Sequence, residues 1–100
     1  MKVAAAQLTS TGNITENQEL ALAKIREAAG NGARLIVLPE ATAQNFRSGR
    51  LDEQAQTLEG PFATAIQALA EELEVTVVAG MFCPADTVER DGKTINRVTN

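Results

Sequence analysis

Two side chains in this sequence have the types and positions that catalysis could use: Glu40, and the single cysteine, Cys83. Glu40 follows the apolar run 35–38 and Pro39. Four apolar residues, two of them β-branched, predict a short strand buried on both faces, which the proline then ends. Ligands and catalytic groups gather just past the carboxyl ends of such strands, where a carboxylate can act as a general base. The alternative is that Glu40 only starts a loop or a helical turn.

Cys83 is the candidate nucleophile, and it follows the third apolar run along the chain. The sequence contains no histidine, which excludes Ser-His-Asp and Cys-His catalysis. Nothing in the sequence places a helix N-terminus or a cation beside the thiol to lower its pKa. We therefore interpret Cys83 as an inert, small side chain and Lys93 as a solvated hairpin residue.

The elements that must position these residues alternate between strands and helices. We expect strands at residues 2–8, 35–38 and 75–79, with a helix in each of the two connections. In each helix, apolar residues recur at helical spacing and form one face. These residues are Ile14, Ala21, Ile25 and Ala28 in the first helix, and Phe62, Ile66, Leu69 and Leu73 in the second. This order predicts βαβ crossovers with parallel strands.

Local signals mark the ends of both helices. Asn13 is a favoured N-cap, and Glu16 three residues later could return a bond to its N–H. Residues 30–32 (Gly-Asn-Gly) should stop the first helix. The second should start at residues 60–61 (Gly-Pro), with proline at its first position.

Two further segments are predicted to lie outside this alternation. Residues 41–56 form a long polar loop around Phe46, which is either functional or a surface connection with Phe46 tucked over the core edge. Asp91 and Gly92 predict a tight hairpin turn between residues 87–90 and 93–98. The sequence then stops without a terminating signal, so we expect the last strand to continue beyond Asn100.

Composition limits the class of protein. The 100 residues suffice for one small domain, with 44% hydrophobic and 22% charged residues and only three aromatic ones. A net charge of −4 with scattered cations argues against nucleic acid as a partner. No apolar run is long enough to span a membrane, and the first residues do not have a signal-peptide pattern, so we expect a cytoplasmic protein. One cysteine excludes an intrachain disulfide and a multi-thiolate zinc site.

Several stretches resemble the opening portion of carbon–nitrogen hydrolases of the nitrilase superfamily. They occur in the family's order along nearly the whole chain: KVAAAQL at 2–8, Glu16-Asn17, GARLIVLPEA at 32–41, LEGP at 58–61, VTVVAGMF at 75–82, and residues 95–98 with an asparagine. The pairing of GARLIVLPEA with VTVVAGMF at this distance is the specific signal. The chain is thus similar to the N-terminal portion, residues 1–100, of such a domain.

The resemblance implies an α/β fold, the opening part of an α-β-β-α sandwich, and a Glu–Lys–Cys catalytic set. Glu40 matches the glutamate, the general base. The family's lysine and cysteine come later, so Lys93 and Cys83 do not match them, and the chain is expected to be an inactive part of an enzyme.

The implied substrate is a small amide, as in the amidase branches, with no metal or organic cofactor. We expect the full-length protein to be a homo-oligomer. The alternative is a non-catalytic α/β module that binds a small molecule or a partner.

Overall fold

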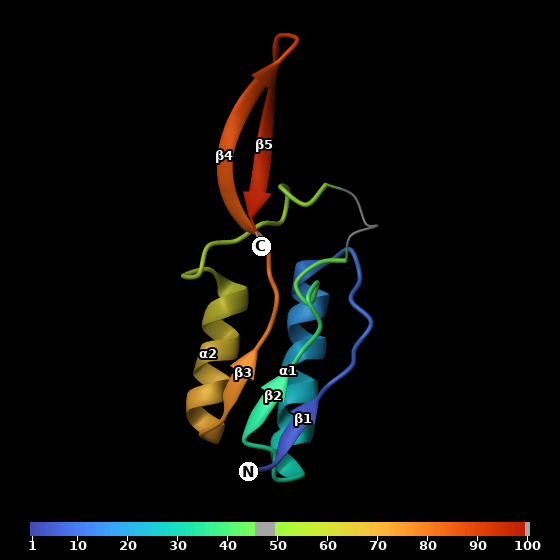
Figure 1. Ribbon diagram of the computed structural model, residues 1–100, viewed down its shortest axis with the longest axis vertical. Helices are drawn as coiled ribbons and strands as arrows, with labels where there is room; N and C mark the ends of the chain where they lie inside the picture. The colour runs from blue at the N-terminus through green and yellow to red at the C-terminus, as the bar shows by residue number, and fades with distance from the viewer. Residues whose placement is uncertain (46–49, 100) are drawn as a thin grey trace.

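The computed structural model describes residues 1–45 and 50–99, which form a parallel sheet with two helices and a projecting hairpin (Figure 1). Its elements, in order, are β1 (Val3–Ala5), α1 (Ile14–Gly30), β2 (Leu35–Val37), α2 (Pro61–Leu73), β3 (Thr76–Val78), β4 (Cys83–Arg90) and β5 (Lys93–Thr99). The first five alternate between strand and helix, and the last two form a hairpin. The predicted role of Phe46 lies outside the described residues.

The parallel sheet has the strand order β1-β2-β3, so β2 is its central strand. Ile36 of β2 aligns with Ala4 on one side and Val77 on the other. Both crossovers are βαβ units with parallel strands, as the sequence predicts. Each strand is shorter than expected, although Leu38 continues the pairing by donating its N–H to the carbonyl of Val78 at 2.8 Å.

Helix α1 begins after Asn13 as predicted, but the N–H of Asn13 has a different hydrogen-bond partner from the one expected. The side chain of Asn13 accepts a hydrogen bond from the Glu16 N–H at 3.0 Å. The N–H of Asn13 itself donates to the hydroxyl of Thr11 at 3.2 Å, so the expected return bond from Glu16 is replaced by one from Thr11. At the other end, Gly32 takes the left-handed conformation, with φ of 91°.

Helix α2 has Gly60 as its N-cap and proline in its first turn, as predicted. Its apolar face lies against the sheet, where Phe62 and Leu69 are buried and Ile66 and Leu73 are partly buried. The helix ends at Glu74, which has a left-handed backbone with φ of 55°.

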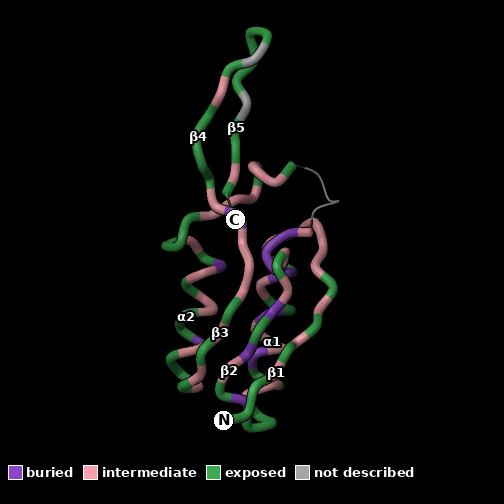
Figure 2. The backbone as a smooth tube through the Cα atoms, in the orientation of Figure 1, coloured by how far each residue is buried: buried purple, intermediate pink, exposed green. Residues whose placement is uncertain are grey.

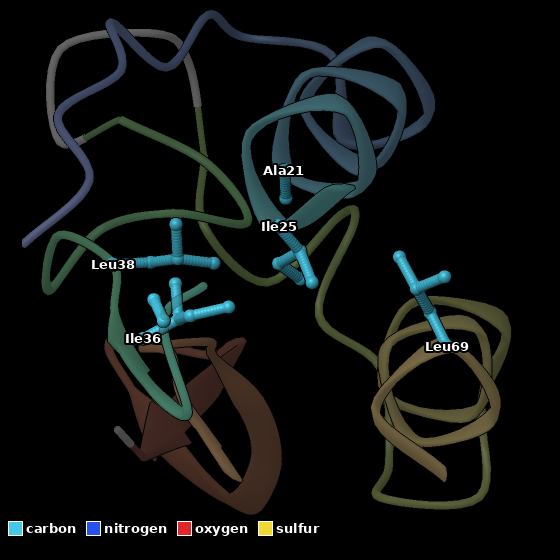
Figure 3. Packing of buried hydrophobic residues seen from close by; sticks show 6 residues of the cluster. Ala21, Ile25, Ile36, Leu38 and Leu69 are labelled. Carbon is cyan, nitrogen blue, oxygen red and sulfur yellow. The ribbon is translucent and has the colours of Figure 1, made fainter. Parts of the chain in front are cut away.

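The core lies between the two helices and one face of the sheet. Figure 3 shows Ala21 and Ile25 of α1 and Leu69 of α2 directed toward Ile36 and Leu38. All five side chains are at most 5% exposed. Both helices therefore cover the same face, as right-handed crossovers between successive neighbouring strands require.

The opposite face of the sheet is uncovered (Figure 2). Val3, Val37 and Val78 point to this side and are 58%, 38% and 52% exposed. The prediction that residues 35–38 are buried on both faces is therefore wrong for this chain. Alternation along β2 buries Ile36 under the helices and turns Val37 to the open side.

The hairpin projects from the end of the sheet at which the parallel strands terminate (Figure 1). Asp91 and Gly92 both have positive φ, 51° and 76°, which confirms the predicted tight turn. β4 starts at Cys83, four residues earlier than expected, with an irregularity between Pro84 and Thr87. The fold shown is thus α/β, with one parallel and one antiparallel sheet. Within the described residues, no helix has the length and apolarity to cross a membrane.

Candidate active site

Glu40 lies where the sequence predicts it, just past the carboxyl end of the central strand β2. Its side chain is exposed in this chain. Because the three strands are parallel, the segments that follow β1 and β3 leave the sheet at the same edge as Glu40. The surroundings of Glu40 are therefore built from three connections that are far apart in the sequence.

Gly80, two residues after β3, passes against the backbone of Glu40. A Cβ atom at Gly80 would lie 1.6 Å from the carbonyl oxygen of Glu40 and 2.5 Å from its carbonyl carbon. Gly80 does not have a positive φ, so glycine is needed at this position for space and not for backbone conformation. This contact fixes how closely the chain after β2 approaches the chain after β3.

The turn that contains Glu40 is closed by hydrogen bonds on both of its sides. The hydroxyl of Thr42, which is fully buried, donates to the carbonyl of Pro39. The N–H of Ala43 donates to the carbonyl of Gly80 at 3.4 Å. The backbone from Pro39 to Ala43 is thus held by one hydrogen bond within the turn and by another to the segment that follows β3.

Asn17 of α1 attaches this turn to the helix layer. Its side chain is fully buried, and its Nδ2 donates to the carbonyl of Ala43 at 2.7 Å and to the carbonyl of Thr11 at 2.9 Å. Asn45 adds two bonds nearby, from its N–H to the carbonyl of Thr11 and from its Nδ2 to the carbonyl of Ser10. The connection after β1 and the turn after β2 are therefore joined both through Asn17 of α1 and directly through Asn45.

A hollow of about 300 Å³ adjoins the turn at the carboxyl ends of β1 and β2. Its lining ends at Pro39, and Glu40 is not among the residues that line it. The residues are Ala5, Ala6, Gln7, Val37, Leu38 and Pro39. This hollow therefore does not place Glu40 inside a pocket.

Cys83 and Lys93 both lie in the hairpin, whereas Glu40 lies in the turn after β2. Cys83 is a half-buried free thiol that begins β4 and aligns with Thr99. Lys93 is exposed beside the hairpin turn, at the end of the molecule away from the parallel sheet (Figure 1). Among the side chains that the structure describes, no group of three or more His, Cys, Asp or Glu is placed to hold a metal ion.

A second polar cluster joins the long loop to the hairpin. The carboxylate of Asp52 accepts hydrogen bonds from Arg50 Nε at 3.0 Å, from Arg50 Nη2 at 2.7 Å and from Asn96 Nδ2 at 3.3 Å. The bonds from Arg50 lower the pKa of Asp52 below its ordinary value, and the bond from Asn96 acts in the same direction. Nothing in the local sequence pattern predicts this contact across 44 residues.

Sequence reasoning finds Glu40 but misses the groups that hold its backbone. Asn17 lies at helical spacing from Ala21 and Ile25, so a polar residue on the buried stripe was the available signal. Gly80 directly follows the strand expected at residues 75–79, and its close approach to Glu40 depends on the tertiary structure, which the local sequence does not reveal.

The structure is thus that of an α/β protein with Glu40 at the carboxyl edge of its parallel sheet. The chain belongs to the carbon–nitrogen hydrolase family, whose sequence model matches residues 2–99. The resemblance found in the sequence is thereby confirmed.

Several curated proteins are similar to this chain along nearly its whole length. The hydrolase Rv0480c of Mycobacterium tuberculosis is 38% identical over 97 residues, which are 96% of this chain and 32% of that protein. A deaminated glutathione amidase of Synechocystis is 35% identical over 96 residues, covering 96% of this chain and 35% of that protein. Nitrilase homolog 2 of Dictyostelium discoideum is 32% identical over 79 residues, 79% of this chain and 24% of that protein. The chain spans about a third of the length of the first two relatives.

Proposed function

We propose that this chain is the part of a carbon–nitrogen hydrolase that carries its general base, Glu40, and that the whole enzyme hydrolyses a small amide. The position of Glu40 directly past β2, on a turn fixed by Gly80 and Asn17, is the observation that supports this role most strongly. The amidase name of one relative supports an amide as substrate.

In the proposed mechanism a cysteine thiolate supplied by the rest of the enzyme attacks the amide carbon. The carboxylate of Glu40 takes the thiol proton and delivers it to the departing nitrogen, so that ammonia or an amine leaves and a thioester remains. Glu40 then takes a proton from the water that attacks the thioester. The C–S bond breaks, the acid leaves, and Glu40 returns the proton to the cysteine sulfur. A lysine, also from the rest of the enzyme, would stabilise the oxyanion in both steps.

We also propose that the uncovered sheet face completes an α-β-β-α sandwich. Val3, Val37 and Val78 would then be buried against a second sheet, because exposed apolar faces of this kind are otherwise unfavourable. In that arrangement Glu40 would be shielded from bulk water by the added layer. We propose further that the full-length enzyme is a cytoplasmic homo-oligomer and needs no metal or organic cofactor.

The test is Glu40→Gln in the full-length enzyme, with Glu71→Gln on the exposed side of α2 as the matched control. We expect Glu40→Gln to abolish hydrolysis of a small primary amide, measured as ammonia release, while the melting temperature stays that of the unchanged enzyme. Glu71→Gln should retain full turnover. The 100-residue chain alone should release no ammonia. Wild-type turnover in a folded Glu40→Gln enzyme would refute the proposal and favour the non-catalytic module.

A further inference from the structure

The side chain of Asn17 uses its whole hydrogen-bonding capacity inside the protein. Its Oδ1 accepts from the N–H of Thr11 at 2.7 Å and from the Thr11 hydroxyl at 3.2 Å. Its Nδ2 donates to the carbonyls of Thr11 and Ala43. An amide has two acceptor and two donor positions, so no capacity is left for another partner. A buried, fully satisfied amide of this kind fixes the groups around it.

The two segments that Asn17 joins are not otherwise neighbours in the chain. Thr11 lies in the connection from β1 to α1, whereas Ala43 lies 26 residues after Asn17 and three residues after Glu40. Figure 1 shows the first turns of α1 beside the segment that follows β2. The bond to Ala43 is therefore a direct link from α1 to the turn of Glu40.

This link holds one end of the turn, and other bonds hold the rest. Ala43 is held through its N–H by Gly80 and through its carbonyl by Asn17. Thr42 closes the turn onto Pro39. Asn45, two residues further on, is bonded to Ser10 and Thr11. Without the Asn17 donor, Ala43 itself would keep its 3.4 Å bond to Gly80, and its buried carbonyl would have to move to find another donor.

We infer that Asn17 is a positioning residue for Glu40: its Nδ2 fixes the far end of the turn from which the carboxylate reaches the reacting atoms. This inference rests on the proposed role of Glu40 as general base. A displacement of about 1 Å in a reacting group can reduce turnover about 100-fold, so a loss in kcat is the expected signature.

The experiment compares Asn17→Asp and Asn17→Ala in the full-length enzyme. Asn17→Asp keeps the shape and the acceptor toward Thr11 but removes both Nδ2 donors, and Asn17→Ala removes the whole amide. Gln54→Glu is the control, because it makes the same amide-to-acid change in a half-buried side chain that bonds Gly12 and Ile14 instead of the Glu40 turn.

We expect both Asn17 variants to lower kcat at least tenfold per folded molecule with KM unchanged, and Gln54→Glu to leave both constants near their original values. The folded fraction is measured by circular dichroism at the assay temperature, since a purely structural role would lower that fraction without changing kcat per folded molecule. Unchanged kcat in folded Asn17 variants would overturn the inference, as would failure of both variants to fold. Glu40→Gln in the same series separates the two proposals: if it retains activity, the proposed base is wrong whatever Asn17 does.

Discussion

Replacing Gly80 by alanine should displace the backbone of Glu40. The added Cβ would lie 1.6 Å from the Glu40 carbonyl oxygen and 2.9 Å from its Cα. Non-bonded carbon contacts settle at about 3.5 Å or more, so one of the two backbones must move by about 2 Å. The obstructing atoms belong to the main chain, which cannot swing aside as a flexible side chain can.

Two opposing effects set the size of the change in stability. Alanine restricts the unfolded chain and by itself would stabilise the fold by about 0.4–1 kcal/mol. Overpacking costs about 1–3 kcal/mol, and a clash with backbone belongs at the upper end of that range. The expected net loss is about 2 kcal/mol, which lowers the melting temperature of a chain of this size by about 8–16 °C.

The assay is urea and thermal unfolding of the 100-residue chain, followed by circular dichroism at low micromolar concentration. Gly30→Ala is the matched control, because Gly30 ends α1 and a Cβ there meets nothing within 4 Å. That variant should be stabilised by about 0.5–1 kcal/mol. If Gly80→Ala is as stable as Gly30→Ala, the close approach between β3 and the Glu40 turn does not exist in solution, and the account of how Glu40 is positioned fails.

Two further predictions concern charge and the open sheet face. The pKa of Asp52 is lower in the folded chain than its ordinary value of 3.8, so ionised Asp52 stabilises the fold at pH values above 3.8. This stabilisation is lost as the pH falls through the lower pKa of the folded state. In Asp52→Asn the free energy of unfolding should therefore fall less steeply below about pH 5 than in the unchanged chain. Because Arg50 is largely exposed, high salt should reduce this difference between the two proteins. Parallel curves of stability against pH for the two proteins would contradict the prediction. The uncovered face should make the 100-residue chain associate, and Val37→Thr with Val78→Thr should weaken this association without removing a strand former. Light scattering over a concentration series is the measurement, and a monomer with a sharply cooperative melt at high concentration would contradict the prediction.

Local chemistry predicts most of the element order in this chain. Asn13, the Gly60-Pro61 pair and the Asp91-Gly92 turn each mark a boundary that the structure confirms, because caps and tight turns depend on a few neighbouring residues. Strand lengths are less predictable. Residues 2–8 form only a three-residue strand, since pairing depends on what the neighbouring strand offers and not on the apolar run alone.

The candidate site is predictable only in part, because its parts meet across long sequence separations. Glu40 follows from a local pattern, the carboxyl end of an apolar run. The bond from Asn17 to Ala43 and the approach of Gly80 to Glu40 depend on how two crossovers place three loops at one edge. The prediction that residues 35–38 are buried on both faces was wrong, because a run of hydrophobic residues does not show whether a second layer covers the valines.

The open valine face has a consequence for how the proposed enzyme is made. A ribosome synthesises a chain from its N-terminus at about 5–20 residues per second. In a protein of the relatives' length, Val3, Val37 and Val78 would therefore be exposed for tens of seconds before the other two-thirds of the chain are made. If these residues fold during that interval, α1 and α2 would cover one face of the sheet and the other face would expose apolar side chains. Such intermediates are the ones that chaperones hold, and the yield of the enzyme in cells should fall when synthesis is slowed downstream of these residues.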